Sequence, residues 1–448
     1  MRETAWTGNA NADRRPGQGA RGTGYLAHMA DPPRRAPLPP TVRALAAVSF
    51  LTDAASEMLH PLMPVFLATV LGASPAFVGT IEGAAESTAA LLKVASGWWS
   101  DRVGRAKPLV VLGYGLATLA RPLVALTTSA SQVLALRLVD RTGKGIRGAP
   151  RDALLAASVD ARDRGRAFGF HRAADHAGAV VGPLVAFALL QWAGMPLRSV
   201  IAWSAVPGVL ALVVLVIAVR EPRDGRAAMI SSRRSATAAR DTVASRAPEH
   251  GSSMTAAPLP RRFWAVLATI VLFTLGNSSD AFLLLRAQQL GVPVAQVPLL
   301  WAAFHVVKSA LATPFGALSD RVGRRTLLLA GWAWYACIYA GFAFATTAWQ
   351  AWALFLLYGV HFALVEGAER ALVAELVPAA RRGIAFGWFN AAIGVAALPA
   401  SLLLGAVWTA HGATSAFLTG AGIAAAACAL GAILLPVTGH DLSAKHRT

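Results

Sequence analysis

The sequence predicts an all-α polytopic membrane protein whose twelve transmembrane helices form two pseudo-symmetric six-helix bundles. Three observations lead to this fold class. Of 448 residues, 55% are hydrophobic and only 14% are charged, a balance typical of membrane proteins. Apolar stretches such as 264–275, 327–345 and 423–435 approach the roughly 20 residues that cross a ~30 Å hydrocarbon core. Finally, the two halves of the chain repeat one another.

Apolar runs divide the chain into six spans, a polar linker and six further spans. The first six are expected at 44–69, 76–99, 108–127, 132–157, 166–192 and 197–219, and the second six at 263–289, 298–318, 326–346, 351–376, 384–408 and 413–435. Residues 1–43 are rich in Gly, Pro and Arg and predict a disordered tail, in which both Met1 and Met29 are candidate starts. The predicted domains are the tail 1–43, an N-terminal bundle 44–219, a linker 220–262, a C-terminal bundle 263–435 and a second tail 436–448.

Basic residues are concentrated in alternate loops. Arg102, Arg105 and Lys107 follow the second span, and similar groups follow the fourth, eighth and tenth, whereas the loops near 127–131 and 347–350 contain none. The positive-inside rule then places the linker and both termini in the cytoplasm of a bacterium, with the protein integral to the cytoplasmic (inner) membrane. Because this topology accounts for the net charge of +18, we expect a lipid bilayer and no nucleic acid as partner.

Two separated motifs recur in the second half of the chain. The stretch GWWSDRVGR at 97–105 recurs as GALSDRVGR at 316–324, an offset of 219 residues. The stretch RGRAFGF at 164–170 recurs as RGIAFGW at 382–388, an offset of 218. Agreement to one residue indicates duplication. Duplicated halves around a central pathway are typical of transporters.

The first repeated motif resembles the G-x-x-x-D-R-x-G-R-[KR] signature between helices 2 and 3, and between helices 8 and 9, of the major facilitator superfamily. The matching residues are Gly97, Asp101, Arg102, Gly104, Arg105 and Lys107, then Gly316, Asp320, Arg321, Gly323, Arg324 and Arg325. The fourth span also resembles that superfamily's fourth-helix motif at Arg137, Arg141, Gly143 and Gly145, and DRTGKGIRGAPRDAL at 140–154 resembles a bacterial subgroup. The resemblance covers about 44–435 and implies alternating access.

The repeated loop motif is predicted to form a cytoplasmic gate. Its expected members are Gly97, Asp101, Arg102, Gly104, Arg105, Gly316, Asp320, Arg321, Gly323 and Arg324. Glycine lets two helices approach closely, an aspartate accepts backbone N–H bonds, and arginines pair with acids and helix C-terminal carbonyls. Positive-inside anchoring alone would explain Arg105 but not the repeated Asp and Gly.

The fourth span carries cations where a membrane helix should be apolar. These cations are Arg137, Arg141, Lys144, Arg147 and Arg151. Each charge costs about 2.5 kcal/mol or more at mid-bilayer, so the side chains must face a wet cavity or acidic partners. Asp140, Arg151 and Asp152 are expected in structural ion pairs, whereas Arg141 and Lys144 are expected to face the cavity. The glycines of this span predict close packing or partial unwinding, and Pro150 predicts a kink.

Other spans contribute acids and histidines at helical spacing. The predicted substrate or proton-coupling residues are Asp53, Glu57, Glu86, Arg141, Lys144, Arg147, His171, Asp175, Asp280, His305, Lys308 and Glu366, while Glu369 and Arg370 are expected in structural ion pairs. Desolvated carboxylates can bind protons reversibly, and a nearby arginine opposes this. Asp53, Glu57 and Glu86 are therefore the proton-carrier candidates, with His171 and His305 as further ones.

The leading functional hypothesis is a monomeric secondary active transporter, coupled to H⁺ or alternatively Na⁺, that moves a small polar or anionic solute. An exporter of drugs or organic cations and a non-transporting membrane sensor are the alternatives. We predict no enzyme and no other cofactor, because H-E-x-x-H, G-x-S-x-G and P-loop motifs are absent from the sequence. The two cysteines, Cys337 and Cys428, fall inside apolar runs, so neither a disulfide nor a metal site is expected.

Asp101→Asn is expected to slow transport without abolishing folding, because the neutral amide cannot hold the gate arginines as a carboxylate does. Initial rates of solute uptake or efflux check this, with the yield of folded protein in the membrane as control. Transport at the wild-type rate would contradict a gating role for the motif.

Overall fold

The computed structural model describes residues 37–103, 106–160, 163–220, 259–378 and 381–436. Of these, the residues from Pro39 onward belong to one compact unit. Within the described ranges every regular element is helical, which confirms the all-α fold class. The predicted linker and both predicted tails fall largely outside these ranges, as do Gly104 and Arg105 of the predicted gate.

The first half of the chain forms six crossings. Its helices are α1 (Pro40–Leu59), α2 (Met63–Thr69), α3 (Pro75–Val103), α4 (Lys107–Leu123), α5 (Ala130–Ala157), α6 (Arg164–Gln191), α7 (Leu197–Trp203) and α8 (Ala205–Ala218). α1 and α2 are joined by a 3₁₀ turn and make one crossing, as do α7 and α8. α1 begins at Pro40, four residues before the predicted span, because proline has no N–H to satisfy and suits the first helical turn.

The second half forms six more crossings. Its helices are α10 (Arg261–Gly276), α11 (Ala281–Gln289), α12 (Val297–Val322), α13 (Arg324–Phe344), α14 (Ala348–Glu375) and α15 (Arg382–Leu434). The single span predicted at 263–289 is interrupted between α10 and α11. α15 turns back on itself at Gly412, whose φ of 84° only glycine adopts readily, so it supplies the last two crossings.

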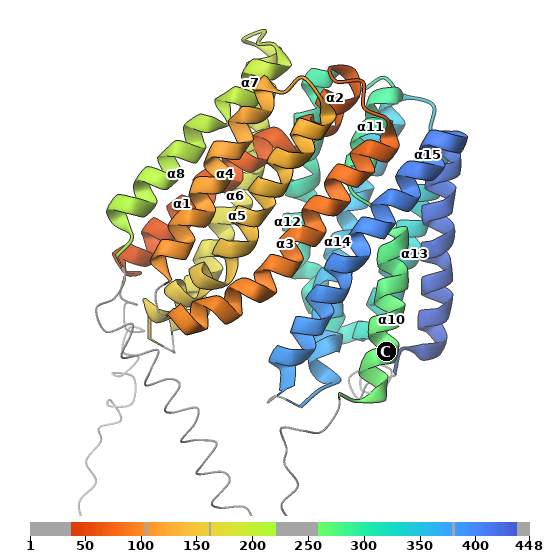
Figure 1. The fold of residues 1–448 in the computed structure, drawn as a ribbon. Coiled ribbons are helices and arrows are strands. Elements are labelled where there is room, and N and C mark those ends of the chain that lie inside the picture. The colour runs from red at the N-terminus through yellow and green to blue at the C-terminus, as the bar shows by residue number, and fades with distance from the viewer. Residues whose placement is uncertain (1–36, 104–105, 161–162, 221–258, 379–380, 437–448) are drawn as a thin grey trace, which may run out of the picture. The chain divides into compact units, whose positions relative to one another are not determined.

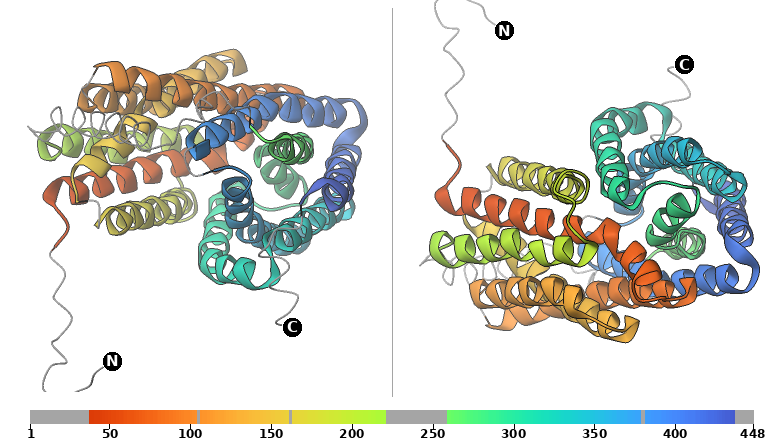
Figure 2. Two further views of the ribbon diagram at one scale, coloured as in Figure 1. Left: turned by 90° about the horizontal axis from the view of Figure 1, so that it is seen from below. Right: turned by 90° about the horizontal axis from the view of Figure 1, so that it is seen from above.

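The two halves pack by the same scheme. In the first half α1 packs on α6, α3 on α5, and α4 on both α5 and α8. The corresponding pairs in the second half are α10 with α15, α12 with α14, and α13 with both α14 and α15. Between the halves, α3 packs on α15 and α6 on α12. Figure 2 shows the helices before residue 220 and those after 258 gathered into two groups.

Equivalent local signals start the fourth and tenth crossings. Ser129 and Gln132 form a capping box at the start of α5, and Thr347 and Gln350 form one at the start of α14. In each, the hydroxyl residue and the glutamine satisfy N–H groups that the first helical turn leaves without partners. The two halves therefore share even the capping boxes that start equivalent helices.

Loops define two ends of the bundle. The end with the loops that follow α3, α5, α12 and α14 is called the basic end, and the end with the loops near Gly72, Thr128 and Gly194 is called the opposite end. In Figure 1 the basic end lies at the bottom. α3 and α15 are in contact where a Cβ on Gly405 would meet Ala76 and where one on Gly394 would meet Ala90. In Figure 1 the two helices diverge toward the basic end.

Glycines let the fourth crossing approach its neighbours closely. A Cβ on Gly143 of α5 would collide with the Gly113 carbonyl of α4, and one on Gly145 would meet Leu92 of α3 at 2.6 Å. α5 is one α-helix through Pro150, so the glycines serve close packing and the predicted unwinding does not occur. Small residues are the usual way for membrane helices to maximise contact, since burial from water supplies no driving force there.

Gly113→Ala is expected to destabilise the protein by about 1–3 kcal/mol, because the added methyl group would lie 2.6 Å from the Gly143 carbonyl oxygen and force α4 from α5. Thermal unfolding of the purified protein in detergent measures the change. Gly115→Ala on the same helix is the matched control, since its Cβ would meet no atom within 4 Å. Equal melting temperatures for the two variants would contradict the role assigned to this contact.

Candidate functional site

Ion pairs fix the part of α5 nearer the opposite end. Arg137 donates from Nη2 to both carboxylate oxygens of Glu82 on α3, at 2.9 and 2.8 Å. Asp140 accepts a 2.9 Å hydrogen bond from Arg121 Nε on α4. Arg121 also donates to the Thr52 carbonyl of α1, so this network joins four helices. All four charged side chains are at most 5% exposed, and each therefore depends on its partners.

The next cation along α5 pairs with a carboxylate that water can reach. Arg141 Nη1 lies 3.4 Å from Oε1 of Glu86 on α3. The Arg141 side chain is 10% exposed, whereas that of Glu86 is 49% exposed. This pair lies between the buried network and an accessible part of the interior. Arg141 was predicted to face a cavity, but its side chain is almost completely buried.

Lys144 and Arg147 follow one and two turns later and differ from the cations before them. Neither makes an ion pair with any residue in the described ranges. Lys144 is exposed, in line with its predicted place on a cavity. Arg147 is buried, stacks 4.3 Å from the centroid of the Tyr114 ring, and has an Nη1 group without a hydrogen-bond partner. These two cations are the unneutralised charges of α5.

Acids from α1 and α6 lie near these two cations. Asp53 of α1 is half-buried, and the charges that act on it include those of Asp175, Arg147 and Lys144. Asp175 of α6 accepts a hydrogen bond from Ser49, and its other oxygen lies 3.5 Å from Nδ1 of His171. Among the described residues Asp53 has no ion-pair partner, so its carboxylate is available to a proton or a ligand.

Glu57 connects the two halves of the chain. Its carboxylate accepts a 2.8 Å hydrogen bond from Trp301 Nε1 of α12 and lies 3.9 Å from Nε2 of His305. The His60 ring, one turn further along, lies 5.0 Å from the Trp301 ring. Separation of α1 from α12 would therefore break a buried polar contact.

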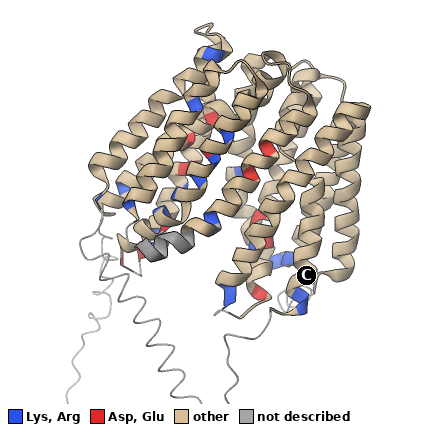
Figure 3. Cartoon of the chain, in the orientation of Figure 1, with Lys and Arg blue, Asp and Glu red and all other residues tan. Residues whose placement is uncertain are grey.

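The second half holds its own charged groups. Lys308 of α12 lies 3.4 Å from Glu366 of α14, which is also 3.4 Å from Arg370. Lys308 also lies over the Phe362 ring, 4.3 Å from its centroid. Arg370, predicted to lie in a structural ion pair, pairs with Glu366 at the i,i+4 spacing, whereas Glu369 has no ion-pair partner among the described residues. Figure 3 shows charged positions along the interior helices of both halves.

Residues predicted to form the gate are only partly described. For Gly97, Asp101, Arg102 and Asp320 the structure gives the helix that carries them and no more. Arg324 pairs with Glu375, and Arg321 is exposed. Gly323 has a φ of 97° and turns the chain from α12 directly into α13. The close helix approach expected at Gly316 is not seen, since a Cβ there would meet no atom of the described residues within 4 Å.

The remaining structural pair predicted on α5 is present, because Arg151 Nη2 lies 3.0 Å from Asp152 Oδ1. Sequence reasoning missed Arg121, which neutralises Asp140. The signal was available, since an arginine inside an apolar span requires an acidic partner as much as Arg137 does. In the described ranges, no group of three or more His, Cys, Asp or Glu residues could hold a metal ion.

The family model for the major facilitator superfamily matches residues 45–287 and 265–448. An uncharacterized MFS-type transporter of Methanocaldococcus jannaschii is 31% identical over 373 residues, which cover 82% of this chain and 88% of the relative. A probable 4-methylmuconolactone transporter of Cupriavidus pinatubonensis is 28% identical over 288 residues, 61% of each chain.

Solved structures show the same fold. The nucleoside transporter NupG superposes with a TM-score of 0.70 at 13% identity, over 88% of this chain and all of that one. This likeness confirms the predicted arrangement of twelve crossings in two related bundles. The chain therefore belongs to the major facilitator superfamily, and it is a membrane-spanning transporter of small molecules and not an enzyme.

Proposed function

We propose that this protein is a secondary active transporter that works by alternating access, is coupled to protons, and moves a small polar or anionic solute. It would act as a monomer in the bacterial cytoplasmic membrane, with the basic end and both termini in the cytoplasm. The observation that carries the proposal is the pair of unneutralised cations, Lys144 and Arg147, halfway along α5.

The position of Lys144 requires a polar environment. It is the fifteenth of the 28 residues of α5, and therefore lies near the middle of the crossing. Val139, which is 40% exposed, marks the apolar outer face of the helix. Lys144 lies about 140° around the helix from Val139, toward the side on which Arg141 meets Glu86. An exposed ammonium at this depth faces a wet interior, because contact with acyl chains would cost several kcal/mol.

An anionic group suits this interior. Arg121, Arg137 and Arg141 are neutralised by Asp140, Glu82 and Glu86 respectively. Lys144 and Arg147 remain, and a carboxylate or phosphate of the solute could accept hydrogen bonds from both. The Cupriavidus relative is a probable 4-methylmuconolactone transporter, and this similarity supports a small organic solute as cargo.

Asp53 is the proposed proton carrier. It is a half-buried carboxylate within reach of the charges of Lys144 and Arg147. When these cations bind an anionic solute, the solute's negative charge offsets their positive charge. Their stabilisation of the ionised Asp53 carboxylate then weakens, and proton binding to Asp53 becomes more favourable. Binding of solute and proton would thus support each other, which is the coupling that a symporter requires.

Alternating access would use the contact between Glu57 and Trp301. The halves meet toward the opposite end through this contact and through α3 and α15, where Ser87 donates to the Gly394 carbonyl at 2.6 Å. On this proposal the basic end, toward which α3 and α15 diverge in Figure 1, is the end that opens to the cytoplasm.

A second candidate, an exporter of organic cations, is favoured by the surroundings of Glu57. The carboxylate lies beside Trp301, whose ring is 5.1 Å from Phe304 and 5.0 Å from His305. A carboxylate beside aromatic rings can bind a cation through both charge and π faces. The charge of the ligands that bind distinguishes the two candidates.

Lys144→Ala is expected to weaken binding of an anionic solute about 10- to 100-fold, the loss for a charge-assisted hydrogen bond, and to leave neutral solutes unaffected. Lys144→Arg, which keeps the charge, is the matched control and should retain most of the affinity. A thermal-shift screen of anionic, neutral and cationic metabolites at two pH values supplies the ligands and then the affinities. Stabilisation by cations alone, undiminished in Lys144→Ala, would favour the exporter.

Asp53→Asn is expected to abolish accumulation of solute driven by a pH gradient while leaving solute exchange across proteoliposomes intact. The amide keeps the shape of the carboxyl group but cannot bind and release a proton. Asp152→Asn is the control, because Asp152 pairs with its neighbour Arg151. Gradient-driven accumulation at the wild-type level in Asp53→Asn would exclude Asp53 as the proton carrier.

A further inference from the structure

The seventh crossing is broken in its middle. α10 ends at Gly276, and Asn277 has φ −92° and ψ 80°, which is not helical. The helix resumes at Ala281, so four residues, 277–280, interrupt the hydrogen-bonded ladder. Backbone carbonyls at such a break lack intrahelical partners, and irregular backbone at this depth is tolerated only inside the protein or beside a cavity.

Asp280, the last residue of this break, is a carboxylate without a basic partner. Its Oδ1 accepts a 2.7 Å hydrogen bond from the hydroxyl of Tyr358 on α14. Of the residues that the structure describes, no Lys, Arg or His lies within ion-pair distance of it. The charges of His60 and Lys308 act on it from further away, and Lys308 is already paired with Glu366.

Two hydroxyl groups beside the break have no hydrogen-bond partner. Ser278 is 6% exposed and Tyr339 is fully buried, and neither the Ser278 Oγ nor the Tyr339 hydroxyl has a partner in hydrogen-bond geometry. Unsatisfied buried hydroxyls are costly, so a cluster of them indicates a ligand.

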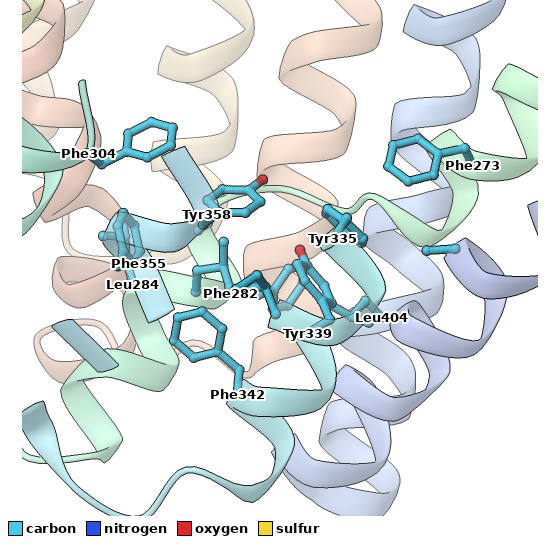
Figure 4. Close-up of a cluster of buried hydrophobic side chains, with 14 of the residues drawn as sticks. Phe273, Phe282, Leu284, Phe304, Tyr335, Tyr339, Phe342, Phe355, Tyr358 and Leu404 are labelled. Carbon is cyan, nitrogen blue, oxygen red and sulfur yellow. The ribbon is translucent and has the colours of Figure 1, made fainter. Parts of the chain in front are cut away.

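Aromatic packing holds these oxygen atoms in place. The Tyr335 and Tyr339 rings stack at 4.2 Å between centroids, and the Tyr358 ring lies 6.4 Å from that of Tyr339. Tyr335 itself donates to the Gly276 carbonyl at the end of α10, at 3.0 Å. Figure 4 shows the hydroxyls of Tyr339 and Tyr358 on the side of the cluster where the α10–α11 connection passes.

We propose that the break between α10 and α11 binds a sodium ion through Asp280, Ser278, Tyr339 and the backbone carbonyls of 277 and 278, because those of 276 and 279 already accept hydrogen bonds. The donors are all oxygen atoms, which hard cations prefer over nitrogen or sulfur ligands. One carboxylate balances one positive charge, whereas a divalent ion would leave an uncompensated charge inside the membrane. Unwound carbonyls and half-helix C-termini are suited to coordinate such an ion.

This site uses other residues than the proposed solute and proton site. Asp280 lies in the second half of the chain, whereas Lys144, Arg147 and Asp53 lie in the first. Sodium binding would hold α10, α13 and α14 together at the break, because its ligands come from the break, from Tyr339 on α13 and, through Asp280, from Tyr358 on α14. It can be measured without any transported solute.

Thermal unfolding of the purified full-length protein at constant ionic strength tests the site, with NaCl exchanged for KCl or N-methylglucamine chloride. We expect the melting temperature to rise by about 2–4 °C with NaCl in a saturable manner. Retention of ²²Na⁺ by the protein, displaced by excess unlabelled NaCl, is the direct measurement. A melting temperature independent of the cation together with no retained ²²Na⁺ would overturn the proposal.

Variants locate the ion. Asp280→Asn should abolish the sodium-dependent shift, and Ser278→Ala and Tyr339→Phe should weaken sodium binding several-fold. Glu366→Gln is the matched control, because this carboxylate is already neutralised by Lys308 and Arg370, and its sodium-dependent shift should persist. If Asp280→Asn does not fold, Ser278→Ala decides through its ²²Na⁺ affinity. Undiminished affinity in both Ser278→Ala and Tyr339→Phe would place the ion elsewhere and overturn the assignment.

Discussion

The structure depends on the cost of charge at bilayer depth. α5 carries five cations in 28 residues, and no lipid-exposed helix could retain them. The cations of α5 differ in how far acidic partners neutralise them. Arg137 is fully paired and buried, Arg141 shares its partner Glu86 with water, and Lys144 has no ion-pair partner among the described residues. Neutralisation falls from Arg137 to Lys144 and returns nearer the basic end, where Arg151 pairs with Asp152. The proposed solute site lies at the cations between these pairs.

Close helix packing lets charged side chains on α5 reach partners on neighbouring helices. Gly113 and Gly143 bring α4 to α5, and Gly145 brings α3 to α5, so that Arg121 can reach Asp140 and Glu82 can reach Arg137. The same device acts between the halves, where Gly79, Gly83 and Gly394 bring α3 and α15 into contact. Small residues thus serve two purposes: they maximise contact in lipid and they shorten the distance that a charged side chain must bridge.

The two halves share packing but differ in chemistry. The first half uses arginine–carboxylate networks, whereas the second surrounds Asp280 with stacked tyrosines and interrupts the helix beside it. Glu57 links the halves through Trp301, and His60 extends this contact. A duplicated scaffold can specialise in this way because its symmetric positions fix where a side chain lies and not what it is. On our proposals, the first half holds solute and proton and the second holds a cation.

The sequence by itself determined the class of fold, the twelve crossings, the duplication and the need for an inward-facing charged surface on α5. These follow from hydrophobicity, periodicity and the cost of charge, which act locally along the chain. Only the tertiary structure decided which charges neutralise each other. Arg121 binds Asp140 from 19 residues away and Trp301 binds Glu57 from 244 residues away, and no spacing rule reaches across helices. The break at 277–280 also required the structure, because tyrosines from α13 and α14 hold it in place.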